Sequence, residues 1–168
     1  MTKQEIGASE LAFMLRDSDS SSGIGTSVPT LDPERNIALY KALTNAMENR
    51  MIRSAHDCSD GGLSVSLAES CFGFSGGADI DVTEILLEDD ELDEWGALFG
   101  ESLGRIIVSV SPECVMEFEK RMKGHAVYKL GKTTSSREVK ISAHGKTVLK
   151  CDVDSLKAAW KGTLDRRA

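Results

Sequence analysis

The residues best suited to chemistry are concentrated in one short stretch, 54–63, which reads Ser-Ala-His-Asp-Cys-Ser-Asp-Gly-Gly-Leu. Four of its side chains can form hydrogen bonds or bind a metal ion, and they fall within five residues: His56, Asp57, Ser59 and Asp60. The glycines that follow can adopt a positive φ, which would let the backbone come close to a ligand. If the chain carries a ligand site, this pattern places it in the turn at 56–62.

The turn leads into a predicted helix from Leu63 to about Cys71, whose N-terminus points back at the polar residues. Free backbone N–H groups and the positive end of the helix dipole would suit a phosphate or a carboxylate there. Asp60 offers another interpretation, because as an N-cap residue it would itself accept hydrogen bonds from those N–H groups. Both interpretations stay open at this point.

The segment 56–63, His-Asp-Cys-Ser-Asp-Gly-Gly-Leu, closely resembles the "HDxSDGGL" signature of the phosphoribosylformylglycinamidine synthase family. A second block, 98–110, is similar to the family's "LFxExxGRxxVxV" segment. Two flanking segments also fit: 6–11 resembles the "GGSE" segment at the start of this domain, and 156–160 resembles its terminal helix. A lone His-Asp or Gly-Gly occurs by chance in many loops, but the order and spacing of these blocks extend the resemblance over essentially the whole chain.

The resemblance implies that the chain is one domain, the C-terminal domain of the synthetase subunit, of the aminoimidazole ribonucleotide synthetase-related type. The family uses ATP and glutamine-derived ammonia to convert formylglycinamide ribonucleotide into its amidine in purine biosynthesis, releasing ADP and phosphate. It implies ATP and Mg²⁺ as cofactors of the full enzyme. The implied partners are the N-terminal portion of the same subunit, a glutaminase subunit and a small bridging subunit. Because the family's catalytic loop belongs to that N-terminal portion, we expect no catalytic residue here and an inactive isolated chain.

The resemblance also assigns roles to particular residues. Asp57 corresponds to a magnesium ligand in the family's first half, and Glu101 to a residue that contacts the substrate. Leu103 replaces an amide side chain of that motif, so one polar substrate contact would be missing. In the second half of the family these positions belong to an auxiliary nucleotide site, and we predict such a site with Asp57 as the metal ligand. Its other predicted residues are His56, Ser59, Asp60, Gly61, Gly62, Glu101, Ser102 and Arg105.

Each main residue also has a purely structural interpretation. His56 would donate to a backbone carbonyl at a strand end, Asp57 would cap a turn, and Glu101 would pair with Arg105, four residues on. If Asp57 and Glu101 instead share one site, the segments that carry them must lie side by side. Their like charges should then raise at least one carboxylate pKa in the metal-free state.

Two other functions stay open. The chain could be the C-terminal domain of another ATP-dependent synthetase of the superfamily, although those enzymes usually carry a different sequence at the signature. It could also be a non-catalytic docking or auxiliary nucleotide module that holds the halves of an enzyme together.

Composition narrows the class of protein. A chain of 168 residues with 40% hydrophobic content is long enough for one domain with its own core. A net charge of −7 makes nucleic acid and anionic membrane surfaces unfavourable partners. The sequence has no apolar run of membrane-spanning length and no signal-peptide pattern, and its four cysteines are widely spaced. We therefore expect reduced thiols, no zinc site and a cytoplasmic protein.

Interleaved strand and helix patterns predict an α/β (α+β) fold with a mixed sheet covered by helices. The resemblance makes this a three-layer α/β/α domain with partial ferredoxin-like topology. We expect residues 1–30 to hold a short helix and a mobile Ser/Gly-rich loop at 17–25, and residues 31–168 to form the single domain. The strongest helix signal starts at Asp32 and Pro33. Its apolar stripe, predicted to pack on a sheet, is Ile37, Tyr40, Leu43, Met47 and Met51.

The remaining elements are predicted from periodicity and from Gly and Pro positions. The other predicted helices are 7–16, 88–99, 112–122 and 154–164. The predicted strands are 78–82, 105–110, 126–130, 139–142 and 147–151, with Gly145 turning the last two into a hairpin.

Overall fold

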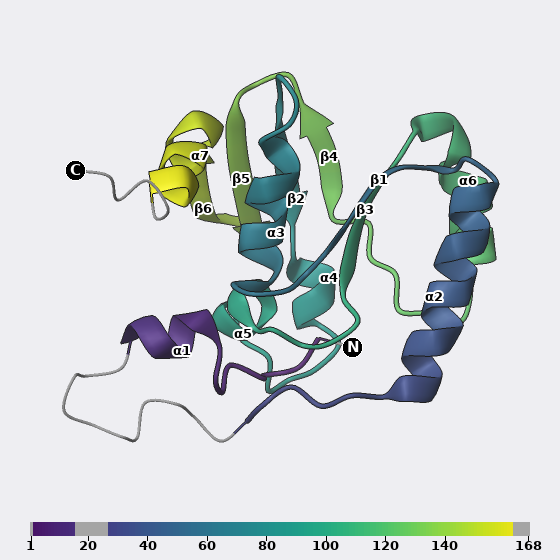
Figure 1. Cartoon of the computed structure of the whole chain (residues 1–168), viewed down its shortest axis with the longest axis horizontal. Coiled ribbons are helices and arrows are strands. Elements are labelled where there is room, and N and C mark those ends of the chain that lie inside the picture. Colours follow the sequence, from purple (N-terminus) through teal and green to yellow (C-terminus); the bar gives the residue numbers. More distant parts are fainter. Residues whose placement is uncertain (1, 16–26, 163–168) are drawn as a thin grey trace.

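The structure, a computed structural model, describes residues 2–15 and 27–162 (Figure 1). The predicted loop at 17–25 lies outside the described residues. The helices are α1 (Glu10–Leu15), α2 (Pro33–Glu48), α3 (Gly62–Cys71), α4 (Thr83–Leu86), α5 (Glu94–Phe99), α6 (Val115–Arg121) and α7 (Val153–Gly162), and a 3-10 turn, η2 (Pro112–Cys114), precedes α6. The strands are β1 (Ile52–Asp57), β2 (Gly77–Asp81), β3 (Ile106–Val110), β4 (Gly131–Thr134), β5 (Glu138–Ala143) and β6 (Lys146–Asp152).

The described strands form two sheets. β1 and β3 make an antiparallel ribbon, and the other strands make a four-stranded sheet in the order β4-β2-β5-β6. Within that sheet β2 and β5 are parallel, whereas the β2–β4 and β5–β6 pairs are antiparallel. The expected mixed sheet in an α/β domain is therefore confirmed.

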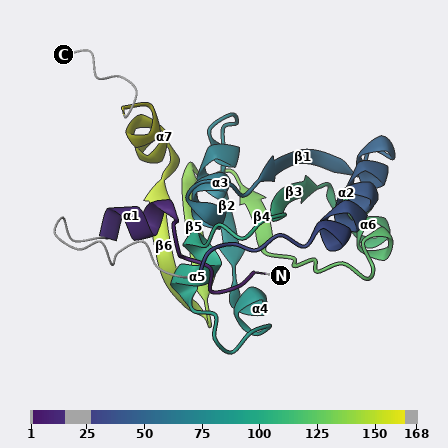
Figure 2. The ribbon, with the colours of Figure 1, turned by 60° about the horizontal axis from the view of Figure 1, so that its bottom comes forward.

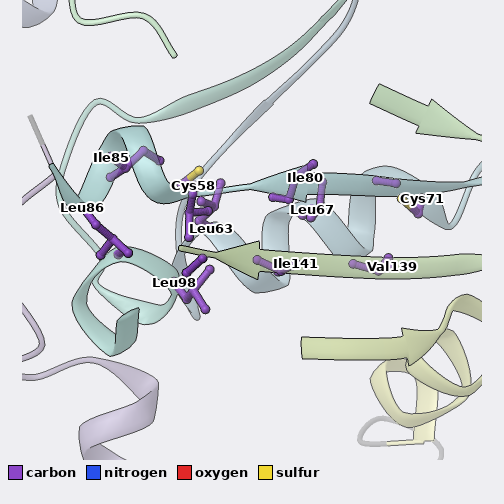
Figure 3. Close-up of a cluster of buried hydrophobic side chains, with 14 of the residues drawn as sticks. Cys58, Leu63, Leu67, Cys71, Ile80, Ile85, Leu86, Leu98, Val139 and Ile141 are labelled. Atoms are coloured by element: carbon purple, nitrogen blue, oxygen red, sulfur yellow. The ribbon is translucent and has the colours of Figure 1, made fainter. Parts of the chain in front are cut away.

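The main core lies between one face of the four-stranded sheet and the helices α3, α4 and α5. Residues of β5 alternate between buried Val139, Ile141 and Ala143 and half-buried Lys140 and Ser142, as a strand with one packed face should. In Figure 3, side chains from β2 and β5 meet those of the helices across this layer. The labelled members are Cys58, Leu63, Leu67, Cys71, Ile80, Ile85, Leu86, Leu98, Val139 and Ile141.

A second, smaller core joins α2 and α6 to the β1–β3 ribbon. Ala46 and Met51 pack there with Phe118 and Met122, and Val108 of β3 lies against them. Ile107, which precedes Val108 in β3, packs instead against the main core, so the two residues connect the ribbon to both cores. Figures 1 and 2 show α2 and α6 side by side at the end of the molecule opposite α7.

The start of α2 agrees with the prediction, but the prediction of which apolar residues of this helix are packed is partly wrong. The Asp32 carboxylate accepts a hydrogen bond from the Arg35 N–H at 3.1 Å, and Pro33 is the first helical residue. Leu43 is buried, because the packed face of the helix is centred on Leu43 and Ala46. Three stripe residues lie outside that face and remain exposed: Ile37 at 53%, Tyr40 at 44% and Met47 at 42%.

Other elements also differ from the sequence prediction. Of the helix predicted at 88–99, only the part that forms α5 is helical, and α4 was not predicted. The strand predicted at 126–130 does not form, and β4 begins at Gly131 instead. The hairpin is confirmed, with His144 at φ 49° and Gly145 at φ 74° between β5 and β6. None of the helices in the described part of the chain has the length and apolarity that crossing a membrane requires.

Candidate functional site

The two sequence blocks meet where β1 ends and β3 begins. Asp57, the last residue of β1, lies opposite Ile106 in the antiparallel ribbon. Directly after it, the Cys58 N–H donates to the Arg105 carbonyl at 2.9 Å. The predicted side-by-side placement of these segments is therefore confirmed, and it brings the polar turn next to the segment that contains Glu101.

The two glycines of the turn let its backbone pack closely against the backbone of the second sequence block. Both have positive φ, 78° at Gly61 and 67° at Gly62. A Cβ atom on Gly62 would lie 2.6 Å from the Gly100 carbonyl oxygen and 2.9 Å from the Phe99 carbonyl carbon. The close approach expected toward a ligand is thus used to pack the start of α3 against the end of α5.

Glu101 connects three segments through a single carboxylate oxygen. Its Oε1 accepts hydrogen bonds from the Gly61 N–H and from the Glu10 N–H, each at 2.9 Å. Gly61 is the N-cap of α3 and makes no side-chain cap bond, so the interpretation of Asp60 as the N-cap is wrong. Glu101 supplies the anionic acceptor beside that helix N-terminus, where negative charge is favourable.

Arg105 does not serve as the expected partner of Glu101. Its guanidinium donates instead to the carbonyl oxygens of Ala97, at 2.8 Å, and Gly100, at 2.9 Å. Burial lowers the Arg105 pKa, while the Cys58 thiol nearby acts in the opposite direction. Ser102 is 2% exposed, and its hydroxyl accepts from the Lys3 N–H at 3.4 Å. Arg105 and Ser102 therefore fix the second sequence block through hydrogen bonds to the domain's own backbone.

His56 has structural partners at both ring nitrogens. Nδ1 lies 2.7 Å from the Asp57 carbonyl oxygen, which matches the predicted bond at the strand end. Nε2 lies 3.3 Å from Oε2 of Glu69 on α3, and the other oxygen of Glu69 accepts from the Trp160 indole at 2.8 Å. Glu69 was not singled out from the sequence, because only its position on α3, facing both β1 and α7, gives it this role.

The exposed part of the turn consists of Asp57, Ser59 and Asp60. The Asp57 side chain is 74% exposed, and the Ser59 hydroxyl donates to its carboxylate. This hydrogen bond is the main reason that the pKa of Asp57 lies below its ordinary value. The shift is opposite to the increase expected from a like-charged neighbour, so the Asp57 carboxylate is ionised and open at neutral pH.

Only part of the predicted magnesium site fits the geometry. The residues that the structure describes contain no group of three His, Cys, Asp or Glu side chains that could hold a metal ion. Mg²⁺ usually keeps several waters and takes one or two carboxylates together with phosphate oxygens. Asp57 suits that arrangement as a single exposed ligand, and the ion would depend on a phosphate-bearing ligand for the rest.

Comparison with curated proteins shows that the chain is similar to part of a longer enzyme. It is 38% identical over 139 residues to the phosphoribosylformylglycinamidine synthase subunit PurL of Carboxydothermus hydrogenoformans. It is 41% identical over 124 residues to the same subunit of Lactobacillus helveticus. These matches cover 82% and 74% of this chain but only 18% and 15% of the relatives' length.

Solved structures show the same fold at lower identity. Thermotoga maritima PurL complexed with FGAR superimposes with a TM-score of 0.71 at 20% identity, over 83% of this chain and 23% of that one. PurLQS from Thermotoga maritima gives a TM-score of 0.69 at 20% identity, over 77% of this chain and 23% of that one. T. maritima PurL complexed with ATP gives 0.63 at 19% identity, over 70% and 21%.

The family model described as "AIR synthase related protein, C-terminal domain" matches residues 5–144. This range contains β1, the signature turn, α5 and β3, and it therefore includes every contact between the two sequence blocks. The chain belongs to the family of AIR synthase related protein C-terminal domains.

Proposed function

We propose that this chain is the C-terminal domain of a phosphoribosylformylglycinamidine synthase and contributes an auxiliary nucleotide site to it. The observation that carries the proposal is the closure of the two blocks on each other, with Gly61 donating to Glu101 at 2.9 Å. The similarity to PurL subunits at 38% and 41% identity supports the same assignment.

In the proposed site, Asp57 would bind Mg²⁺ and the exposed Ser59 and Asp60 would contact the nucleotide or its waters. Asp57 supports this because it is ionised and points to solvent. Gly61, Gly62 and Glu101 would shape the turn. The remaining residues of the predicted site, His56, Ser102 and Arg105, would position it, since their polar atoms already have partners within the chain. Bound ATP would supply the phosphates that complete the magnesium coordination.

In the whole protein, the proposed reaction is the ATP-dependent conversion of formylglycinamide ribonucleotide to its amidine with glutamine-derived ammonia. The proposed partners are the N-terminal portion of the same subunit, a glutaminase subunit and a small bridging subunit, in the cytoplasm. The solved structures of T. maritima PurL with ATP and of PurLQS support these proposals. Because the chain spans 18% of its relative's length, we propose no catalytic residue in it and no activity for the chain alone.

A second candidate is a non-catalytic module that holds the enzyme together without binding nucleotide. It is favoured by the way Glu101 and Arg105 are used, because both side chains bind backbone groups of the domain itself. The two candidates differ in one respect, namely whether the exposed Asp57 carboxylate matters for activity.

Reconstitution tests the proposal. The chain would be combined with the N-terminal portion of a PurL subunit, and ADP formation that depends on formylglycinamide ribonucleotide and ammonia would be measured. We expect activity only when both parts are present. Asp57→Asn should reduce it, whereas Asp90→Asn, at an exposed aspartate between α4 and α5, should not. Activity of the chain alone, or a complex that forms but remains inactive, would contradict the assignment. Equal activity of both variants would favour the non-catalytic module.

A further inference from the structure

One face of α2 is exposed to solvent. Its outward residues follow each other at the spacing of a single helix face and line a shallow groove. The residues that line the groove are Ile37, Tyr40, Lys41, Thr44, Asn45 and Glu48. Met47 lies beside the groove and is 42% exposed, so the apolar surface extends along most of the helix.

The charges on this face are arranged symmetrically about its centre. Lys41 and Glu48 are exposed, and neither side chain has a hydrogen-bond or ion-pair partner among residues 2–15 and 27–162. They lie equally far from the midpoint between Thr44 and Asn45, on opposite sides of it. Since seven residues make about two turns, the two charges point in nearly the same direction, about 10 Å apart along the helix.

We propose that the α2 face binds a second copy of this chain, with the two α2 helices antiparallel about a two-fold axis near Thr44 and Asn45. In this arrangement Lys41 of each copy lies opposite Glu48 of the other, because the rotation exchanges the two ends of the helix. Tyr40 of one copy then lies at a similar position along the helix axis to Met47 of the other, and the contact removes their apolar surfaces from water.

The surroundings of the face suit such contact. A charged side chain of another element, Arg121 of α6, donates to the Asn45 side chain at 2.8 Å. Glu117 binds the same guanidinium at 3.0 Å, so its charge is already paired. Figures 1 and 2 show α2 at the outer edge of the molecule, where a second copy can approach it.

One helix face is smaller than the interface of a stable dimer, so the expected association is weak, with a Kd on the order of 100 μM. Sedimentation velocity or light scattering of the purified chain from about 10 μM to 1 mM covers this range. We expect the average mass to rise from one copy toward two copies. A chain that remains a monomer over the whole range would overturn the proposal. That result would also be expected if a different protein, and not a second copy, covered this face.

Charge reversal tests the antiparallel arrangement. Lys41→Glu and Glu48→Lys should each weaken the dimer about tenfold, because each change replaces two opposite-charge pairs with two like-charge pairs. The double variant Lys41→Glu/Glu48→Lys should restore dimerisation to near the original level. The matched controls are Lys123→Glu and Glu119→Lys, which make the same charge changes at exposed positions on and beside α6 and should have no effect.

Failure of the double variant to recover would overturn the proposed register. If the α6 control variants weakened the dimer equally, net charge and not the α2 face would control association. That result would also overturn the proposal. Circular dichroism of every variant at micromolar concentration establishes that the fold is retained before the masses are compared.

Discussion

Replacing Gly62 by alanine tests whether the glycine pair serves to pack the two sequence blocks. The substitution adds a Cβ atom where the nearest backbone atoms would lie 2.6, 2.9 and 3.0 Å away, all in the segment Leu98–Gly100. It also places alanine at a φ of 67°, in the left-handed region. The left-handed conformation costs about 1 kcal/mol and the contact with backbone about 2 kcal/mol, which together lower the free energy of unfolding by about 3 kcal/mol.

Two other glycines separate these contributions. Gly145→Ala has a φ of 74° and open space around the new Cβ atom, so it should cost about 1 kcal/mol. Gly73→Ala has neither a positive φ nor a neighbour within 4 Å, so its effect on the free energy of unfolding should be about 0.5 kcal/mol or less.

Urea unfolding followed by circular dichroism measures the series. With a slope of about 2 kcal/mol per molar urea, Gly62→Ala should lower the midpoint by about 1.5 M and Gly145→Ala by about 0.5 M. A Gly62→Ala variant no less stable than Gly145→Ala would refute the idea that backbone packing between α3 and α5 requires this glycine.

Three further predictions follow from individual contacts. Arg105→Met should lower the free energy of unfolding by about 2 kcal/mol in urea titrations, because two carbonyl oxygens at the end of α5 lose their donors. Asp32→Ala should cost about 1 kcal/mol in the same assay through loss of the N-cap of α2, and Asp32→Asn should recover most of it. The carboxyl of Asp57 should titrate below its ordinary pKa of 3.8 in an NMR pH series, and Ser59→Ala should move that pKa upward. Because the pKa of Asp57 is lowered in the folded state, its carboxylate favours the folded state above pH 3.8, and this contribution is lost as the pH falls through the folded pKa. An Asp57 titration midpoint that Ser59→Ala leaves unchanged would contradict the assigned cause.

Local signals in the sequence were sufficient where a short motif determines the structure. Asp32 and Pro33 begin α2 as predicted, because N-capping and the fixed φ of proline act within one turn. Glu117 and Arg121, one turn apart on α6, form an ion pair for the same local reason. Gly145 allows the hairpin between β5 and β6, since a two-residue turn needs positive φ.

The prediction failed where neighbouring side chains compete with the backbone. The acidic run before α5 does not join the helix, because Asp89 accepts from the Glu91 N–H and Asp93 caps α5 through the Gly96 N–H. Near residue 130, tertiary packing decides the outcome. Leu130 packs on the main core, and its carbonyl accepts from the Asp81 N–H before the regular pairing of β4 begins.

The candidate site was predictable in composition but not in its contacts. The turn and the second block could be singled out from residue types and family resemblance. That Glu101 binds the Gly61 and Glu10 N–H groups, rather than Arg105, depends on three segments meeting in space. The exposed α2 face could not be predicted either, because periodicity marks apolar positions without showing which of them the rest of the chain covers.

We propose that the turn at 57–62, held by Glu101, is a weak nucleotide and magnesium site of a larger synthetase. An NMR titration of the isotope-labelled chain with ATP and Mg²⁺ tests it most directly. The amide signals of Asp57 through Gly62 should shift most, the shifts should need Mg²⁺, and saturation should require concentrations well above the micromolar range, because one exposed carboxylate cannot hold the ion without further ligands. Shifts confined to other parts of the chain, or no shifts at all at millimolar ATP and Mg²⁺, would contradict the claim.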